Sequence, residues 1–203
     1  MSRKQLEIQL TQSIRGFSKP KIEFEQYQTP PRVAANLLHI AWTRDHIENC
    51  EVIDLCAGTG ILGIGAALLG ANSTLIEIDP DAYTILQQNI ADFDLPITTE
   101  LADVIDHEFT SSYDTAVLNP PFGIQQKSRS DMDFVKKAAD IAQHIYSIHD
   151  GSSKNQERLP KLFDNNDLEI VEAYLEDFPL TQSYPWHTSA RKIHQVLIIH
   201  SKS

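Results

Sequence analysis

Cysteines, long apolar runs and central positive charges are all scarce in this sequence of 203 residues. The two cysteines, Cys50 and Cys56, match neither the spacing of zinc-ligand pairs nor a disulfide framework. The longest apolar run, residues 61–71, spans 11 residues, whereas a membrane helix needs about 20. The first residues also lack the apolar stretch of a signal peptide. We therefore expect no membrane partner and a cytoplasmic location, with the nucleus as a second place in a eukaryotic cell.

Positive charge is missing from one continuous block. Residues 51–118 contain 12 acidic residues and no Lys or Arg, although the whole chain has 17 such cations and a net charge of -11. A polyanion such as RNA would therefore meet a basic surface built from the two ends of the chain. The competing interpretation is that the acidic charge only keeps the protein soluble.

After residue 50 the sequence alternates between short apolar strands and amphipathic helices. The first 32 residues are predicted to be irregular or weakly helical, because Thr29, Pro30 and Pro31 interrupt any helix. Asp79 is the predicted N-cap of the helix that starts at Pro80. We predict helices at 32–43, 62–69, 80–93 and 133–149, and strands at 52–55, 73–78, 97–101, 115–118, 168–175 and 193–200.

The order of these elements predicts the fold class. Strands linked by helices form a parallel sheet, and two strands without a helix between them usually pair antiparallel. The last two predicted strands are of this second kind. The predicted class is therefore α/β, with a mostly parallel sheet flanked by helices and an antiparallel hairpin at its C-terminal end.

A glycine-rich turn between a strand and a helix is the first candidate ligand site. Gly58, Gly60 and Gly63 follow the strand at 52–55 and let the backbone approach a ligand closely. Glu77 and Asp79 lie 17 and 19 residues after Gly60, near the spacing at which an acid binds a ribose diol in dinucleotide-binding folds. The pattern predicts a nucleoside ligand with free ribose hydroxyls. A turn that only packs the helix on the strand is the alternative.

Both NAD and S-adenosylmethionine carry such a nucleoside, and charge distinguishes them. A pyrophosphate is met by helix N-terminal amides and often by cations, but this block has no cation. A sulfonium is attracted by carboxylates such as Asp54. Asp103, after the strand at 97–101, is a candidate acceptor for the adenine amine, or an exposed turn residue. The predicted cofactor is therefore S-adenosylmethionine.

The tetrapeptide Asn119-Pro120-Pro121-Phe122 directly follows a buried strand and is the most specific motif in the chain. Two prolines remove two backbone donors and fix two φ angles, so carbonyls can point outward from a rigid loop. An aromatic amine is a poor nucleophile, and oxygens aimed at its hydrogens stabilise the positive charge that grows during attack. The Asn119 side-chain oxygen and the Pro120 carbonyl are the predicted acceptors, and Phe122 is predicted to stack on the base. The alternative is a turn that only ends the strand.

The loop after the tetrapeptide carries two cations, Lys127 and Arg129, which we predict to contact RNA phosphates. A solvated loop is the alternative. The target base must be single-stranded or flipped out of a duplex to reach the pocket, and Tyr184 and Trp186 are further stacking candidates. The eight histidines show no metal-ligand spacing in the sequence, so no metal site is predicted.

Taken together, these motifs resemble the class I, Rossmann-like methyltransferases that methylate amino groups with S-adenosylmethionine. More narrowly, the sequence is similar to the methyltransferase-like 5 family, which methylates an adenine amino group at one site in small-subunit ribosomal RNA. The similarity covers nearly the whole chain and is most selective at residues 26–29 and 131–134. In two places the sequence differs: Cys56 replaces the first glycine of the family's turn, and the family's basic C-terminal run is reduced to Arg191-Lys192.

The resemblance implies where the cofactor and a partner bind. Residues 1–31 would be an N-terminal arm and cofactor lid, with Gln26 and Thr29 closing over the methionine end, and residues 32–203 the methyltransferase domain. It implies a heterodimer with a small zinc-ribbon activator protein, docked by β-augmentation on an exposed sheet edge. The uncharged segment 73–76 is compatible with an unprotected or a covered strand. Together with the arguments above, the predicted cofactor-binding residues are Gln26, Thr29, Asp54, Cys56, Gly58, Gly60, Ile61, Glu77, Asp103, Val104 and Asn119.

The sequence thus predicts an S-adenosylmethionine-dependent methyltransferase acting on the exocyclic amine of an rRNA adenosine. A DNA base or a protein glutamine amide is the alternative acceptor, although Phe122 stands where glutamine methylases usually have Tyr. A catalytically idle cofactor-binding assembly factor is disfavoured by the intact tetrapeptide. An NAD-dependent oxidoreductase is least favoured, because the sequence offers no hydride-transfer partner.

Overall fold

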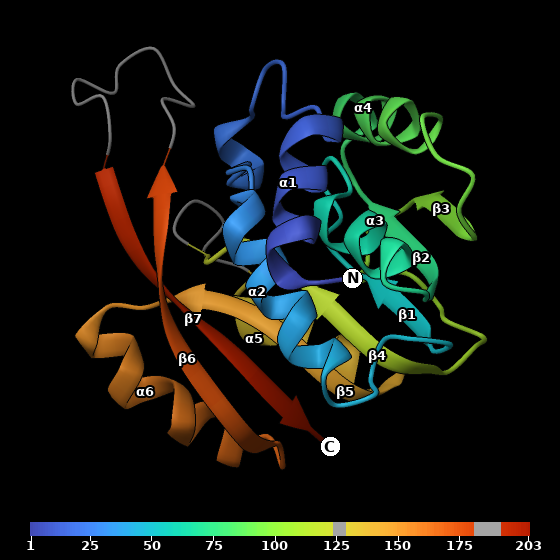
Figure 1. The fold of residues 1–203 in the computed structure, drawn as a ribbon. Helices are drawn as coiled ribbons and strands as arrows, with labels where there is room; N and C mark the ends of the chain where they lie inside the picture. Colours follow the sequence, from blue (N-terminus) through green and yellow to red (C-terminus); the bar gives the residue numbers. More distant parts are fainter. Residues whose placement is uncertain (124–128, 181–191) are drawn as a thin grey trace.

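The computed structural model describes residues 1–123, 129–180 and 192–203 of the chain. Its strands form one seven-stranded sheet in the order β3-β2-β1-β4-β5-β7-β6 (Figure 1). The first five strands run parallel, whereas β7 runs antiparallel to both of its neighbours. The predicted C-terminal hairpin is therefore confirmed. The strands are β1 (Glu51–Asp54), β2 (Asn72–Glu77), β3 (Ile97–Leu101), β4 (Tyr113–Leu118), β5 (Ala142–Asp150), β6 (Glu169–Leu180) and β7 (Lys192–Lys202).

Helices cover both faces of this sheet. Neighbouring positions of a strand point to opposite faces, so Val52 joins the core under one set of helices and Ile53 the core under the other. The first face carries α1 (Arg3–Ser13), α2 (Pro31–Trp42), α3 (Ile61–Leu68) and α4 (Pro80–Ile90), and the second carries α5 (Asp131–Ala139) and α6 (Ser153–Asp164). None of the helices in the described residues is both long and apolar enough to cross a membrane.

Local sequence signals explain where the helices begin. Asp79 is the N-cap of α4, as predicted, because its side chain accepts a hydrogen bond from the backbone of Asp81. The helix α5 begins with a capping box, in which Ser130 and Asp133 bond to each other's backbone N–H groups. These caps place the loops that precede the two helices, and both loops lie at the carboxyl ends of the parallel strands.

The predicted helix at 133–149 is wrong in its second half. The helix α5 ends at Ala139, and the chain then forms β5 between β4 and β7. Residues 145–149 are buried without interruption, so this central strand lacks the alternation of apolar and polar residues that identifies a half-buried strand. Ile145, Tyr146 and Ile148 match a buried strand in residue type, but their spacing also fits a helix face.

Two further helices differ from the prediction. Residues 3–13 form α1, whose Leu6 and Leu10 are fully buried, so this part of the N-terminal segment is regular and contributes to the core. The helix α6 was not predicted, because Pro160 lies inside it and its buried apolar residues are only Leu159 and Phe163. The segment 73–76 belongs to β2, which lies between β1 and β3 and is a covered strand.

Candidate active site at the carboxyl ends of the strands

The strand order reverses at β1, which pairs with β2 on one side and with β4 on the other. In open parallel sheets, ligands bind beyond the carboxyl ends of the strands at such a point. A cavity of about 310 Å³ lies there. Asp54 and Gly60 do not line it, and Lys127, Tyr184, Trp186 and Arg191 lie outside the described residues. The predicted site residues that do line it are Gln26, Thr29, Cys56, Gly58, Ile61, Glu77, Asp103, Val104, Asn119, Pro120, Pro121, Phe122 and Arg129.

The glycine-rich turn forms the floor of the cavity. Gly58 has a φ of 55°, and a Cβ atom at this position would lie 2.9 Å from the ring of Phe17. The backbone N–H of Gly58 donates to one oxygen of Glu77 at 2.7 Å, and the N–H of Asp79 donates to the other at 2.8 Å. These bonds hold the Glu77 carboxylate at the end of β2, although burial raises the pKa of its carboxyl group. Each carboxylate oxygen keeps capacity for a further donor.

Asp54 supports this turn from behind. It is 1% exposed and accepts a hydrogen bond from the backbone of Gly63 at 2.9 Å. Burial raises the pKa of the Asp54 carboxyl to about 7, against the hydrogen bonds that favour its charged form. Because Asp54 does not reach the cavity, its structural contribution is to fix the start of α3.

Cys56, the residue before Ala57 in the glycine-rich turn, lines the cavity. Burial raises the pKa of its thiol well above the usual value, and the nearby carboxylates of Glu77, Asp54 and Asp103 add to the shift. The thiol is therefore neutral at pH 7, and it presents a small, weakly polar surface to the cavity.

The N-terminal segment covers one side of the cavity. Lys21 contacts Asp79 at 2.6 Å and Asp81 at 2.8 Å. The Gln26 side chain donates to Asp79 at 2.7 Å and accepts from the backbone of Lys21 at 2.7 Å. Burial opposes ionisation of Asp79, but the hydrogen bonds from Lys21 and Gln26 outweigh it and lower the pKa of that carboxyl. The segment is thereby fastened to the start of α4, and Asp79 is occupied by protein donors.

The tetrapeptide is held by two bonds to the same N-terminal segment. The side-chain N–H of Asn119 donates to Thr29 Oγ1 at 3.0 Å. The backbone N–H of Phe122 donates to a carboxylate oxygen of Glu25 at 2.8 Å. With its nitrogen bonded to Thr29, the Asn119 amide has its oxygen available as an acceptor. The arrangement fixes the two ends of the tetrapeptide against the cavity.

Two residues with different predicted functions, Arg129 and Asp103, form an ion pair. Arg129, the candidate phosphate contact, donates to Asp103, the candidate adenine acceptor, at 2.7 Å and lies 3.6 Å from Asp106. The other oxygen of Asp103 accepts from the backbone of Ile105 at 3.0 Å. Both side chains line the cavity and are only partly exposed to solvent. Arg129 therefore closes this side of the cavity rather than extending into solvent.

Several residues of the site were not predicted from the sequence. Glu25 and Phe17 contact the tetrapeptide and the glycine-rich turn respectively. Phe178 and Val196, from the C-terminal hairpin, complete the wall of the cavity. Glu25 has a positive φ of 51°, which only the structure reveals. Its partner Phe122, 97 residues away, is likewise set by the tertiary structure alone.

Comparison with known proteins extends this description to a family. A family model described as "Conserved hypothetical protein 95" matches residues 30–167. The rRNA N(6)-adenosine-methyltransferase METTL5 of Danio rerio is 36% identical over 193 residues, which cover 92% of each chain. The rRNA N(6)-adenosine-methyltransferase Mettl5 of Drosophila melanogaster is 36% identical over 151 residues, which cover 71% of each chain.

Among solved structures, the crystal structure of the Pyrococcus horikoshii protein PH1948 has a TM-score of 0.88 to this chain at 32% identity. The superposition covers 99% of this chain and 98% of the other. A match of this extent includes the N-terminal segment and the C-terminal hairpin, so the similarity goes beyond the strand–turn–helix unit that many nucleoside-binding folds share.

Proposed function

Because this chain belongs to the methyltransferase-like 5 family of rRNA N(6)-adenosine methyltransferases, we propose that it transfers a methyl group from S-adenosylmethionine to the exocyclic amine of an adenosine in ribosomal RNA. The observation that carries the proposal is the placement of Asn119, whose amide is oriented by Thr29 at the cavity. An oxygen fixed in this way is what a weakly nucleophilic aromatic amine requires.

The cavity fits the proposed cofactor in its acidic lining and in its close backbone approach. Glu77, at the end of β2, is assigned to the ribose diol, and Asp103 and Val104 to the adenine. Gln26 and Thr29 are assigned to the methionine end, so that residues 1–31 serve as arm and lid and residues 32–203 as the catalytic domain. When bound, the cofactor supplies a methyl group activated by a sulfonium.

The remaining cofactor contacts follow from the turn. The absence of a side chain at Gly58 gives the cofactor access to the backbone, and Ile61 and Cys56 line the same wall. Gly60 and Asp54 act from behind the turn, where a Cβ on Gly60 would lie 2.4 Å from Leu86. Their proposed contribution to cofactor binding is indirect.

The chain's own residues then stabilise the methyl transfer. The adenine amine attacks with its lone pair, a bond from carbon to nitrogen forms, and the bond from carbon to sulfur breaks. Positive charge grows on the nitrogen, and its two N–H groups donate hydrogen bonds to Asn119 Oδ1 and to the Pro120 carbonyl oxygen. Phe122 stacks on the base and Pro121 stiffens the loop. After transfer, the alkylated nitrogen releases its extra proton to solvent, so no side chain has to remove it beforehand.

RNA is proposed to approach over Arg129 and Lys127. The pairing of Arg129 with Asp103 supports coupled binding of cofactor and RNA. The cofactor's adenine amine would be a new partner for Asp103, and an RNA phosphate would be a new partner for Arg129. The base has to be unpaired or flipped out to reach the tetrapeptide. The proposed RNA is the small ribosomal subunit's, in the cytoplasm or nucleus.

A small zinc-ribbon activator is the proposed protein partner. The strand β3 is an edge of the sheet, and Leu101 at its end is 49% exposed. An uncovered edge strand is a template for β-augmentation. We therefore assign the activator to β3 and not to segment 73–76, which lies inside the sheet.

The test is a methylation assay on the full chain with tritiated S-adenosylmethionine and small-subunit rRNA, with and without candidate zinc-ribbon proteins. Digestion of the RNA to nucleosides identifies the product, and N6-methyladenosine is the expected one. If label appears only in added DNA or in a protein glutamine, the acceptor is that molecule and not rRNA. Cofactor binding without any labelled product, with every partner added, would favour an idle assembly factor.

A further inference from the structure

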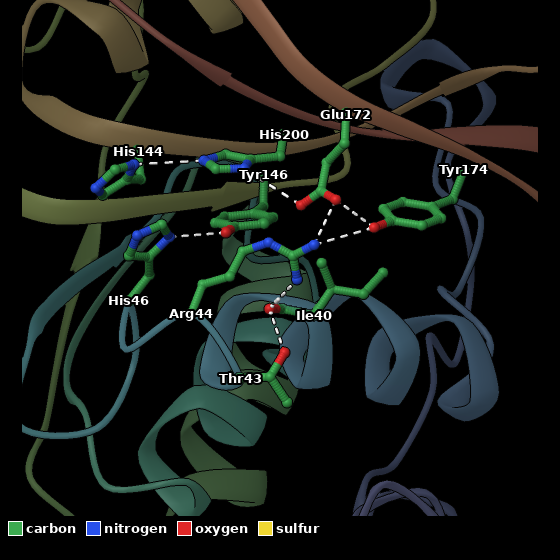
Figure 2. Close-up of polar contacts among 9 residues, drawn as sticks. All are labelled: Ile40, Thr43, Arg44, His46, His144, Tyr146, Glu172, Tyr174 and His200. Carbon is green, nitrogen blue, oxygen red and sulfur yellow. Dashed lines mark hydrogen bonds and ion pairs between the residues drawn. The ribbon is translucent and has the colours of Figure 1, made fainter.

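Three histidines that are distant in sequence lie close together (Figure 2). They lie at the amino ends of the parallel strands, whereas the cavity lies at the carboxyl ends. His46 lies between α2 and β1, His144 lies on β5 and His200 lies on β7. One ring nitrogen from each lies within 4.8 Å of the other two. The strand pairing explains the meeting, because β5 and β7 are neighbours and Tyr146 lies opposite His200.

The ring nitrogens have the second partners that metal-binding histidines use. His200 Nε2 is 3.3 Å from His144 Nδ1, and its other nitrogen faces the carboxylate of Glu172 at 3.5 Å. His46 Nδ1 is 2.8 Å from the hydroxyl of Tyr146. Histidine ligands of metals characteristically direct one nitrogen to the ion and the other to a carboxylate or similar acceptor. The outward nitrogens of His200 and His46 have such partners here.

A second observation comes from buried atoms that lack a partner. His200 is 3% exposed, and its Nδ1 has no hydrogen bond among the described residues. The facing oxygen of Glu172 is also buried and has no hydrogen bond there. Buried polar atoms are nearly always paired. An ion on His200 Nε2 would fix the tautomer that carries hydrogen on Nδ1, and that N–H would donate to Glu172.

The charges around the rings are compatible with a cation. Burial, more than any neighbouring charge, lowers the pKa of His46 to about 4, and it also lowers the pKa values of His144 and His200. All three rings are therefore neutral at pH 7, and each has one ring nitrogen with a lone pair. Two cations lie near the rings, and each is paired with an acid: the guanidinium of Arg44 with Glu172 (Figure 2), and the ammonium of Lys202 with Glu169.

We propose that His46, His144 and His200 bind one divalent transition-metal ion, with Zn²⁺ as the natural occupant. The expected ligands are Nε2 of His200, Nδ1 of His144 and Nε2 of His46, with water in a fourth, tetrahedral position. Glu172 and Tyr146 would orient the rings. The ion would join the turn before β1 to β5 and β7, and this site is independent of the proposed methyl transfer.

Binding requires one local movement. The rings of His46 and His144 are stacked with centroids 3.5 Å apart and an angle of 12° between their planes. An ion in the plane of one ring lies out of the plane of the other, so the His46 ring has to tilt. The backbone of His46 is fixed to β4, because its carbonyl accepts from Thr115 Oγ1 at 2.7 Å. The movement is thus confined to the side chain.

The experiment is a titration of the full chain with Co²⁺ after removal of metals by a chelator. Tetrahedral Co²⁺ absorbs strongly in the visible range, and one equivalent is expected to saturate that band. His46→Gln, His144→Gln and His200→Gln are each expected to weaken binding at least 10-fold. His107→Gln is the matched control, since His107 contacts Glu100 and Phe109 away from the cluster.

A second measurement guards against misfolding of a variant. His46→Gln is the safest substitution, because it changes a partly exposed turn residue, and circular dichroism checks its fold. Zn²⁺ should raise the thermal midpoint of the wild-type chain and of His107→Gln, and leave that of His46→Gln unchanged. The proposal is overturned if no saturable band appears, or if the band and the thermal shift persist in the three variants, or if His107→Gln abolishes them.

Discussion

The two ends of the sheet hold their polar groups in different ways. At the carboxyl end, carboxylates accept hydrogen bonds from backbone N–H groups, as Glu77 does from Gly58, and also from side chains of other segments, as Asp79 does from Gln26. At the amino end, side chains contact other side chains, as His200 does with His144 (Figure 2). Backbone bonds fix loops and leave a cavity of about 310 Å³ between them. At the amino end the rings stack closely instead, as His46 does on His144 with centroids 3.5 Å apart.

The difference shows what each end can bind. A nucleoside needs a wall of backbone and small side chains that stays open, and the carboxyl end supplies it. A metal ion needs a few convergent lone pairs and no cavity, and the amino end supplies three imidazoles. The following changes should therefore affect one end and leave the other unaltered.

Replacement of Asn119 by Ala is expected to have the largest effect, at the carboxyl end. Loss of one oxygen that stabilises developing charge should lower the turnover number about 10²–10³-fold. Cofactor affinity, measured by calorimetry, should change little. Thermal stability at pH 5 should also stay close to that of the wild type. Unchanged turnover would remove the proposed role of the amide oxygen.

Replacement of Gly63 by Ala tests the packing behind the cavity. The new Cβ would lie 2.4–2.7 Å from three side-chain atoms of Leu75, which is fully buried. Overpacking of this kind costs about 1–3 kcal/mol in the free energy of unfolding, measured by urea denaturation. Gly16→Ala is the control, because its Cβ would meet Gln28 at an ordinary 3.7 Å. If Gly63→Ala is as stable as Gly16→Ala, α3 can shift away from Leu75 without a cost in stability.

Replacement of Glu25 by Ala tests the tether between the N-terminal segment and the tetrapeptide. Loss of the acceptor for the Phe122 N–H should lower kcat about 10-fold, with a smaller change in KM for RNA. Glu25→Gln keeps an oxygen acceptor and should recover most of the rate. If Glu25→Gln is as slow as Glu25→Ala, the effect comes from the charge of Glu25 instead.

Replacement of Lys21 by Ala should loosen the same segment more weakly. Lys21 bridges Asp79 and Asp81, and solvent screening keeps the contribution of such partly exposed ion pairs small. The dissociation constant of the cofactor should therefore rise no more than about fivefold. Lys4→Ala, which removes only a contact with Glu7 on α1, is the control. Equal effects of the two substitutions would contradict a lid function.

At the amino end, His46 should make stability depend on pH in the absence of metal. Its pKa is about 4 in the folded chain against 6.5 in the unfolded chain, so the unfolded state binds more protons between these values. Stability should fall as the pH is lowered from 6.5 to 4. His46→Gln should flatten that slope in denaturant titrations with a chelator present, whereas Asn119→Ala should keep it. The charged and titratable groups that face His46 are Arg44, Asp45, His144, Tyr146 and His200.

Local signals were enough for much of the fold. The Asp79 cap, the strand before Gly58 and the strand before Asn119 were all predicted near their observed places. The strand β5 was missed, because a strand buried on both faces has the composition of a buried helix and lacks alternation. The segment that forms α1 was predicted as irregular or only weakly helical, because only Leu6 and Leu10 face the core.

The candidate site divides in the same manner. The tetrapeptide and Asp103 were singled out by their positions after strands, and Glu77 by its spacing after Gly60 and its place at a strand end; all of them line the cavity. The bond from Phe122 to Glu25 joins residues 97 positions apart, and no spacing rule connects them. The pairing of Asp103 with Arg129 likewise needed the course of the loop.

By itself, the sequence determined the parts that depend on a few adjacent residues: the glycines of a turn, the prolines of a loop and the acids at strand ends. Short-range sterics and hydrogen bonding fix such units wherever they occur. Only the tertiary structure decided which units meet. The order of the strands brought His144 beside His200 and the N-terminal segment over the tetrapeptide, because contacts across a sheet depend on the burial of whole faces and not on neighbours in the chain.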